Sequence, residues 1–242
     1  MADSRLIQPF VRKWEGGLSR SKSDYASKNP APCMYQGYND WHTNKGVTWV
    51  AYAAYKKSIG RSSDCIEFFK MDDKLWTAIF EYKYWNPYLL NEYKYQSIAN
   101  TLFSWGWGSG VAGGFHLMSK YLKSKGFDYY VSSKPNFNEA AADTARYMTK
   151  DNLRRMKNDL EALVEKHGEM AIFVELANAR ETFFRGIGGA NLKGWLNRLA
   201  EFKIVNQSFF STLSGDDSKK KIVAIAMLLT VSVGMYMIVK NL

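Results

Sequence analysis

Glu15 is the first residue whose position suggests chemistry. It stands four residues after Val11 and eight after Ile7, so a helix through this segment places Glu15 on the apolar stripe. Partial desolvation raises the pKa of a carboxyl group, which suits a proton donor that works near neutral pH. Gly16 and Gly17 follow directly and remove side chains where a substrate would have to approach. The simpler alternative is a glutamate at a helix end, paired with a neighbouring basic residue.

Five motifs follow one another along the chain. They are Trp14-Glu15-Gly16-Gly17, Thr43-Asn44-Lys45-Gly46-Val47-Thr48, Tyr84-Trp85-Asn86-Pro87, the segment from Gln96 to Gly110, and Asn191-Leu192-Lys193-Gly194-Trp195-Leu196-Asn197-Arg198-Leu199. In this order they resemble glycoside hydrolase family 108, the phage-type N-acetylmuramidases of lysozyme-like fold. The fourth and fifth resemble the start and the closing helix of the peptidoglycan-binding half that accompanies those enzymes. The resemblance covers about residues 6–206.

The resemblance implies hydrolysis of the β-1,4 bond between N-acetylmuramic acid and N-acetylglucosamine, in phage-type cell lysis or wall penetration. It also implies that Glu15 is the catalytic acid. The chain departs from the family in two places. A longer, aromatic insertion over residues 18–41 replaces a compact aspartate-rich turn, and Ser104 stands where many relatives have an aspartate.

Glycosidases ordinarily use a second carboxylate as nucleophile or to activate water. Asp24 and Asp40 are the only candidates between Glu15 and the threonine motif. Asp24 is favoured, because its spacing of nine residues from Glu15 is similar to that of the Glu–Asp pair in related phage lysozymes. Thr43 or Thr48 could hold the attacking water. A lone-glutamate mechanism, assisted by the substrate's acetamido group, stays open, as does a lytic transglycosylase reaction.

Aromatic and amide side chains are the candidates for contact with the sugar rings. Tyr25 lies with other tyrosines in the long insertion, and long loops on a rigid scaffold commonly carry recognition. Trp105 and Trp107 are two residues apart, so on a helix their indoles cannot share a face and at most one stacks on a saccharide. The expected substrate-binding residues are Tyr25, Asn44, Trp85 and Trp107.

The composition excludes several other classes of protein. A chain of 242 residues that is 46% hydrophobic can bury one sizeable core or two small ones, which excludes a disordered chain or a disulfide framework. The two cysteines and three histidines show no metal-ligand or redox spacing, so we expect no metal site and no cofactor. The net charge of +10 points to an anionic partner. The basic residues are scattered instead of forming a stripe, which argues against nucleic acid.

The elements that must position these residues are mainly helices, because no alternation of strands with helices and no repeat is present. The first predicted helix contains Ile7 and Val11 and ends at Gly16. Residues 18–47 are predicted to be loops with a short hairpin. The other predicted helices cover residues 48–58, 72–84, 96–107, 112–124, 138–166, 169–185 and 191–206. The predicted organisation is a lysozyme-like catalytic region over 1–94, a helical peptidoglycan-binding-like region packed on it over 95–206, a linker over 207–221 and a transmembrane helix over 222–239.

The C-terminal prediction rests on eighteen uncharged residues, 222–239, that follow three lysines. At about 1.5 Å per residue they span roughly 27 Å, close to the hydrocarbon thickness of a bilayer. The alternative is a buried core helix. The N-terminus lacks a signal-peptide pattern, and the lysines before the span place the body in the cytoplasm when it is first made. We therefore expect a membrane-anchored enzyme that acts on the cell wall, with Cys33 and Cys65 as reduced thiols at synthesis.

Two functions of different classes remain. The first is an active muramidase, whose partners are peptidoglycan glycan strands and, through the C-terminal helix, the membrane. The second is a catalytically silent wall-binding or virion structural protein that kept the fold and lost turnover through the altered segment 18–41. Retention of Glu15 with both following glycines favours the enzyme.

Overall fold

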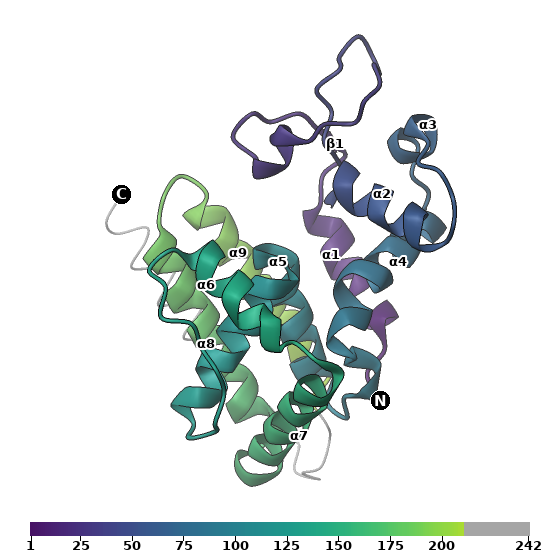
Figure 1. Cartoon of the computed structure of the whole chain (residues 1–242). Coiled ribbons are helices and arrows are strands. Elements are labelled where there is room, and N and C mark those ends of the chain that lie inside the picture. Colours follow the sequence, from purple (N-terminus) through teal and green to yellow (C-terminus); the bar gives the residue numbers. More distant parts are fainter. Residues whose placement is uncertain (211–242) are drawn as a thin grey trace. The chain divides into compact units, whose positions relative to one another are not determined.

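The chain is mainly helical, with one small sheet, in a computed structural model that describes residues 1–210 (Figure 1). The expected fold class, mainly α, is confirmed. The described residues form two compact units, one over Met1–Ala162 and one that begins at Leu163. Within the described residues no helix is long and apolar enough to cross a membrane. The predicted transmembrane helix over 222–239 lies outside those residues.

The bounds of the elements agree with most of the predicted helices. The first unit holds α1 (Gln8–Trp14), α2 (Trp49–Ser58), α3 (Cys65–Phe69), α4 (Asp73–Phe80), α5 (Gln96–Ser124), α6 (Phe137–Thr144) and most of α7 (Lys150–His167). The second unit holds α8 (Glu169–Ile187) and α9 (Leu192–Gln207). The strands are β1 (Leu18–Ser19), β2 (Thr43–Asn44) and β3 (Val47–Thr48). A π-helical turn, Glu81–Trp85, continues α4.

Side-chain caps begin two of the helices where the sequence predicted them. Thr48 Oγ1 accepts a hydrogen bond from the Ala51 backbone N–H at 3.1 Å, and Asp72 Oδ1 accepts one from Leu75 at 2.7 Å. Each cap satisfies a backbone donor that has no partner within the first turn of its helix. The predicted starts of α2 and α4 are therefore confirmed.

Two predictions about helices were wrong. The helix expected over 138–166 is divided into α6 and α7 by the 3-10 turn Ala145–Tyr147, because Thr149 Oγ1 caps a new helix by accepting from the Asn152 N–H at 3.2 Å. The short helix α3 was missed, since five residues are too few to show a helical period.

Helix α5 is interrupted where the sequence predicted a break between two helices. Gly110 has φ 72° and ψ 156°, a conformation that residues with a side chain rarely adopt. Tyr88 packs against α5 on both sides of this break and donates its hydroxyl proton to the Val111 carbonyl at 2.5 Å. The glycine-rich segment therefore serves close packing of a helix on a buried tyrosine.

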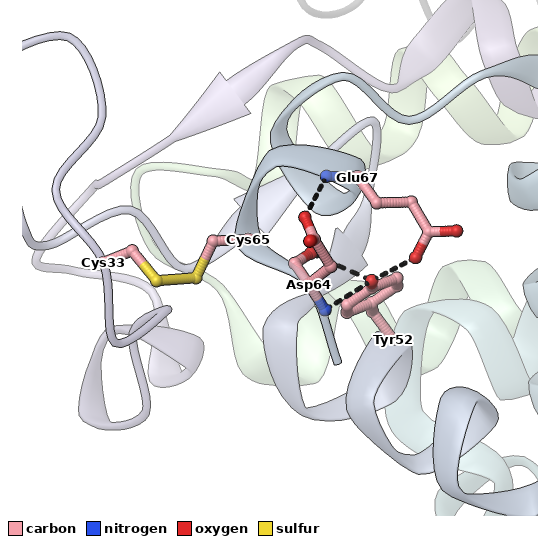
Figure 2. The surroundings of a disulfide bond; sticks show 5 residues. All are labelled: Cys33, Tyr52, Asp64, Cys65 and Glu67. Carbon is pink, nitrogen blue, oxygen red and sulfur yellow. Dashed lines mark hydrogen bonds between the residues drawn. A yellow bond between two sulfur atoms is a disulfide. The ribbon is translucent and has the colours of Figure 1, made fainter. Parts of the chain in front are cut away.

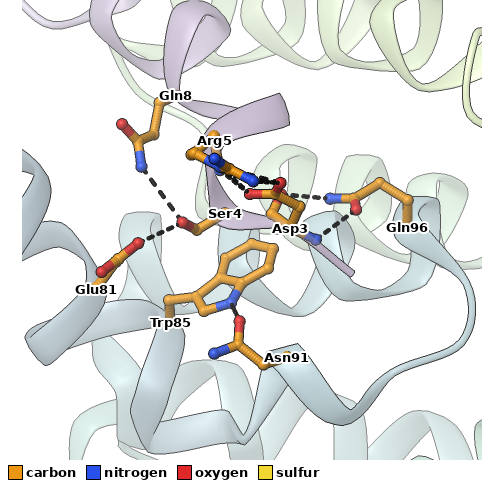
Figure 3. Close-up of polar contacts among 8 residues, drawn as sticks. All are labelled: Asp3, Ser4, Arg5, Gln8, Glu81, Trp85, Asn91 and Gln96. Carbon is orange, nitrogen blue, oxygen red and sulfur yellow. Dashed lines mark hydrogen bonds and ion pairs between the residues drawn. The ribbon is translucent and has the colours of Figure 1, made fainter. Parts of the chain in front are cut away.

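The first residues of the chain tie α1 to the helices that follow it in the core (Figure 3). The Asp3 N–H donates to Gln96 Oε1 at 2.8 Å, and Gln96 Nε2 donates to the Asp3 carbonyl at 3.0 Å. Ser4 Oγ donates to Glu81 Oε1 at 2.5 Å. These bonds connect the start of α1 to the π-helical turn and to the start of α5. The orientation of α1, which leads to Glu15, is fixed in this way.

The small sheet brings a hairpin next to the end of α1. Strand β2 pairs antiparallel with β1 on one side and with β3 on the other, with Ser19 opposite Thr43. The loop between β2 and β3 is only Lys45 and Gly46, with φ of 49° and 77°. Two positive φ values in a two-residue loop are typical of a type I′ turn, for which glycine is favoured. The predicted short hairpin is therefore present.

The insertion over residues 18–41 is held by a disulfide, a bond that the sequence did not predict, and the expectation of reduced thiols at synthesis stays a prediction. Cys33 in the insertion is bonded to Cys65, the first residue of α3 (Figure 2). Helix α3, which carries Cys65, is held in turn by Tyr52. The Tyr52 hydroxyl contacts Glu67 and accepts a hydrogen bond from the Asp64 N–H at 3.0 Å. Burial, followed by the bond to Glu67, raises the pKa of Tyr52. The sequence contained no signal for the Cys33–Cys65 pair, because the two cysteines are 32 positions apart and meet only through the placement of α3.

Removing the disulfide is expected to lower stability without unfolding the protein. The bond closes a loop of 32 residues, and a cross-link of that length contributes about 3–4 kcal/mol by restricting the unfolded chain. Cys33→Ser/Cys65→Ser should lose that amount of unfolding free energy in denaturant titration. Reducing agent should lower the midpoint of the unaltered protein and leave that of the double variant unchanged. An equal effect on both would show that the loss has another cause.

Candidate active site

Glu15 lies directly after α1. The helix ends at Trp14, and the Glu15 N–H closes it by donating to the Val11 carbonyl at 3.1 Å. Glu15 itself has an extended backbone, with φ −92° and ψ 123°, and its side chain is half-buried. The sequence placed it on the buried stripe of the helix. It lies instead at the turn from α1 into β1, where Gly16 and Gly17 are exposed.

Gly46 in the hairpin loop lies against the carboxyl group of Glu15. A Cβ atom at position 46 would stand 2.4 Å from Glu15 Oε2 and 2.7 Å from Glu15 Cδ. Atoms of this kind do not approach so closely, so the carboxyl group occupies the space that any other residue at 46 would fill. The loop is held against the end of α1 because the Lys45 N–H donates to the Gly17 carbonyl at 3.1 Å.

Trp107 on α5 contacts the same carboxyl group from another element. Its indole N–H donates to Glu15 Oε1 at 2.7 Å. The hydrogen bond joins two residues that are 92 positions apart in the sequence. Three elements therefore converge on Glu15: the end of α1, the loop between β2 and β3, and the part of α5 that precedes its break.

The indole of Trp107 is surrounded by aromatic rings. The ring centroids of Tyr84, Phe103, Phe80 and Trp76 lie 4.5, 5.6, 5.7 and 6.1 Å from it. Burial, with a smaller contribution from the negative charge of Glu15, raises the pKa of Tyr84 to about 12. Tyr84 is therefore neutral near pH 7. The carboxyl group has a neutral, largely apolar wall on this side.

The threonines and the asparagine of the hairpin have structural contacts. The Thr43 hydroxyl is bonded to His42 Nδ1 at 2.8 Å, and Thr48 caps α2. Asn44 is buried and donates to the carbonyls of Phe68 and Phe69 at 2.7 and 3.2 Å. Asn44 therefore joins the hairpin to α3, and its expected contact with substrate does not fit its position. The proposed holding of a water by Thr43 or Thr48 stays a prediction.

The two candidates for a second acid lie in the insertion. Asp24 is exposed and accepts a hydrogen bond from the Ala26 N–H at 3.0 Å, as the cap of a 3-10 turn. Asp40 is paired with Arg20 at 3.9 Å through Oδ2. Its other oxygen, Oδ1, is buried and has no hydrogen-bond partner within residues 1–210.

The aromatic candidates for sugar contact differ in exposure. Tyr25 is 75% exposed, with Lys28 Nζ 4.5 Å from its ring centroid, so its ring can reach solvent. Trp85 is fully buried and donates its indole N–H to Asn91, so the expected contact with substrate is wrong. Trp105 is buried as well, whereas Trp107 is half-buried. Of the two neighbouring tryptophans, only Trp107 reaches the candidate site.

Sequence reasoning did not identify Gly46 and Tyr84 as neighbours of Glu15. Both belong to motifs that were recognised, but the motifs do not tell which atoms meet. The described part of the chain contains no group of histidine, cysteine, aspartate and glutamate side chains that could hold a metal ion. What the site offers is one carboxyl group, one directed N–H donor and an aromatic wall.

Comparison with protein families supports a carbohydrate-cleaving activity for part of the chain. Residues 8–110 match the family model of glycosyl hydrolase 108, so this part of the chain is a glycoside hydrolase domain. The match supports a peptidoglycan hydrolase of the N-acetylmuramidase type in general. A solved structure of SagA from Brucella abortus is 18% identical, with a TM-score of 0.49, and the alignment covers 86% of this chain and 95% of SagA. Comparison with curated proteins found no match.

Filling the space at Gly46 is expected to displace Glu15 and lower activity. Gly46→Ala places a methyl group on the carboxyl group, and a shift of about 1 Å in a catalytic group costs on the order of 10²-fold in rate. Gly60→Ala is the matched control, because Gly60 also has a positive φ, 69°, but a Cβ there would meet no atom within 4 Å. On thermal unfolding Gly60→Ala should lose only the stability that a side chain at positive φ costs, and Gly46→Ala should lose more, because its methyl group also meets the carboxyl group. Equal wall-clearing rates for the two would contradict this arrangement.

Proposed function

We propose that this glycoside hydrolase cleaves the β-1,4 bond between N-acetylmuramic acid and N-acetylglucosamine in peptidoglycan, with Glu15 as the general acid. The observation that carries the proposal is the convergence of the Gly46 loop and the Trp107 indole on this carboxyl group, inside residues 8–110. The biological setting that we propose is cell lysis or wall penetration of the phage type.

In the proposed reaction Glu15 gives its proton to the oxygen of the glycosidic bond. The bond between that oxygen and the anomeric carbon breaks, and its electron pair stays on the departing oxygen. Positive charge develops on the anomeric carbon, and a water molecule adds there as the new hydroxyl group while its other proton passes to a carboxylate. Glu15 is placed for this step because its side chain is half-buried beside a neutral aromatic wall and is held by the Trp107 indole.

The contacts of the two aspartates favour Asp40 over Asp24 as a second acid. Asp24 already accepts a backbone hydrogen bond as a cap, which is a structural task. Asp40 has a buried oxygen, Oδ1, that finds no hydrogen-bond partner within residues 1–210, and its other oxygen lies 3.9 Å from the Arg20 guanidinium. A carboxylate oxygen that is not engaged in a structural hydrogen bond is suited to activate water or to stabilise the developing positive charge. Assistance by the acetamido group of the substrate is the alternative.

We further propose that the enzyme works outside the reducing cytoplasm. The supporting observation is the Cys33–Cys65 disulfide, because such bonds persist in oxidising compartments. The membrane anchor over 222–239 is part of the same proposal, and it rests on the sequence alone. An enzyme made in the cytoplasm reaches the wall in this scheme after another protein breaches the membrane, or as part of a delivered particle.

Replacing the proposed acid should abolish turnover and leave the fold intact. Glu15→Gln keeps the shape and a hydrogen-bond acceptor for Trp107 but cannot give up a proton. Loss of general acid catalysis should lower the rate of wall clearing by at least about 10²- to 10⁴-fold. Glu139→Gln, a change at an exposed position on α6, is the control and should remain fully active. Full activity of Glu15→Gln would remove Glu15 from the mechanism, whereas absence of wall clearing by the unaltered protein would leave the wall-binding or structural alternative.

The second acid is tested by comparing two matched variants on the same purified walls. Asp24→Asn should retain nearly full activity, because asparagine caps a helical turn about as well as aspartate. Asp40→Asn should lose activity, because an amide can neither activate water nor stabilise positive charge. Full activity in both variants would instead indicate assistance by the acetamido group of the substrate.

A further inference from the structure

We propose that Trp107 is a positioning residue that determines which oxygen of Glu15 gives up the proton. The inference rests on the proposed function, because it needs Glu15 to be the acid. The sequence had suggested that Trp107 stacks on a sugar ring. The structure directs its polar edge to Glu15 Oε1 instead, at 2.7 Å.

The argument begins with the chemistry of the indole group. An indole N–H can donate a hydrogen bond and cannot accept one. The oxygen that faces it, Oε1, must therefore supply a lone pair in both protonation states of Glu15. The bond is strongest when the acid proton lies on the other oxygen, so that Oε1 is the carbonyl oxygen of the acid. The proton that is transferred is accordingly the one on Oε2.

The second step is the rigidity of the indole. Trp107 and Phe103 are four residues apart and face the same side of α5, and their ring centroids are 5.6 Å apart. Tyr84 packs closer still, at 4.5 Å, and Phe80 and Trp76 complete the surroundings. Rotation of the indole would require these rings to move. The N–H direction is thus set before substrate arrives, which is the condition for an effective positioning group.

The third step concerns the oxygen that remains. Glu15 Oε2 lies alongside the α-carbon of Gly46, where a Cβ would be 2.4 Å away. Oε2 therefore packs against the backbone of the loop, in the space that a side chain at position 46 would fill. The indole and the glycine therefore make the two oxygens different: Oε1 is held by a donor, and Oε2 faces a position without a side chain.

The indole also acts after the proton has left. When Oε2 gives its proton to the glycosidic oxygen, Glu15 becomes a carboxylate, and the N–H on Oε1 then binds a charged acceptor. Hydrogen bonds to charged acceptors are roughly twice as strong as those between neutral groups. The bond therefore strengthens as the leaving oxygen is protonated, and Trp107 should affect kcat more than substrate binding.

The test removes the N–H with as little other change as possible. The analogue 3-benzothienylalanine, in which sulfur replaces the indole N–H, is incorporated at position 107 of the full chain, alongside Trp107→Phe. Trp85→Phe is the matched control. It removes another indole N–H, the one bonded to Asn91, and its ring lies 6.2 Å from Phe103 in the same aromatic core. Thermal unfolding of each variant shows whether the fold is retained.

Two substrates separate positioning of the acid from a structural effect. The first is a soluble glycan fragment of peptidoglycan, whose leaving oxygen needs a proton. The second is the dinitrophenyl β-glycoside of the disaccharide that ends in N-acetylmuramic acid, whose leaving group departs without one. We expect the analogue to lower kcat on the glycan by about 10- to 100-fold, with KM unchanged, and to leave the aryl glycoside within about twofold of the unaltered enzyme. Trp85→Phe should change neither rate.

Each other outcome overturns the inference. Unchanged kcat on the glycan shows that the N–H does not position Glu15. Equal losses on both substrates show a general structural effect, and a raised KM with unchanged kcat shows that Trp107 is a sugar-stacking residue. Glu15→Gln is measured in parallel to separate the two proposals. If Glu15→Gln is inactive and the analogue fully active, only the role of Trp107 fails, whereas a fully active Glu15→Gln removes the proposed function itself.

Discussion

The hydrogen bond between Trp107 and Glu15 is the interaction on which the site depends. It joins the end of α1 to the middle of α5, across 92 residues of sequence, at 2.7 Å. A bond of this length requires that both helices be fixed to within a fraction of an ångström. The position of α1 relative to α5 is fixed near the N-terminus, where the paired bonds between Asp3 and Gln96 connect the start of α1 with the start of α5. The direction of the indole N–H is fixed by the aromatic rings that pack around Trp107.

The hairpin adds a requirement of its own, because its loop must approach Glu15 without a side chain at position 46. Asn44 holds the hairpin by donating to the backbone of α3, and α3 is bonded through Cys65 to Cys33 in the insertion. The insertion is therefore connected, through α3 and the hairpin, to the loop that faces the carboxyl group of Glu15. A disulfide far from Glu15 in sequence thus helps to fix its surroundings. This connection explains how the hairpin is held in place beside a long, irregular segment.

Much of this could be predicted from the sequence, and the failures have physical reasons. The caps Thr48 and Asp72 and the break at Gly110 were predictable because they depend on local chemistry. The roles of Trp85 and Asn44 were not, since burial of a tryptophan or an amide depends on which elements pack around it. Trp107 was identified as a site residue for its ring, but its N–H proved to be the group in contact. The bond between Cys33 and Cys65 depends on α3, a helix too short to be seen in the sequence.

The central claim is that Glu15 protonates the glycosidic oxygen and that water completes the cleavage. Mass spectrometry of the muropeptides released from purified cell walls tests it most directly, because each chemistry leaves a different end. The account predicts new reducing ends on N-acetylmuramic acid, present with the unaltered enzyme and absent with Glu15→Gln. Anhydro-muramic ends would contradict hydrolysis by water and indicate a lytic transglycosylase. Free peptides as the only products, or the same fragments from Glu15→Gln at an undiminished rate, would contradict the proposed catalytic role of Glu15.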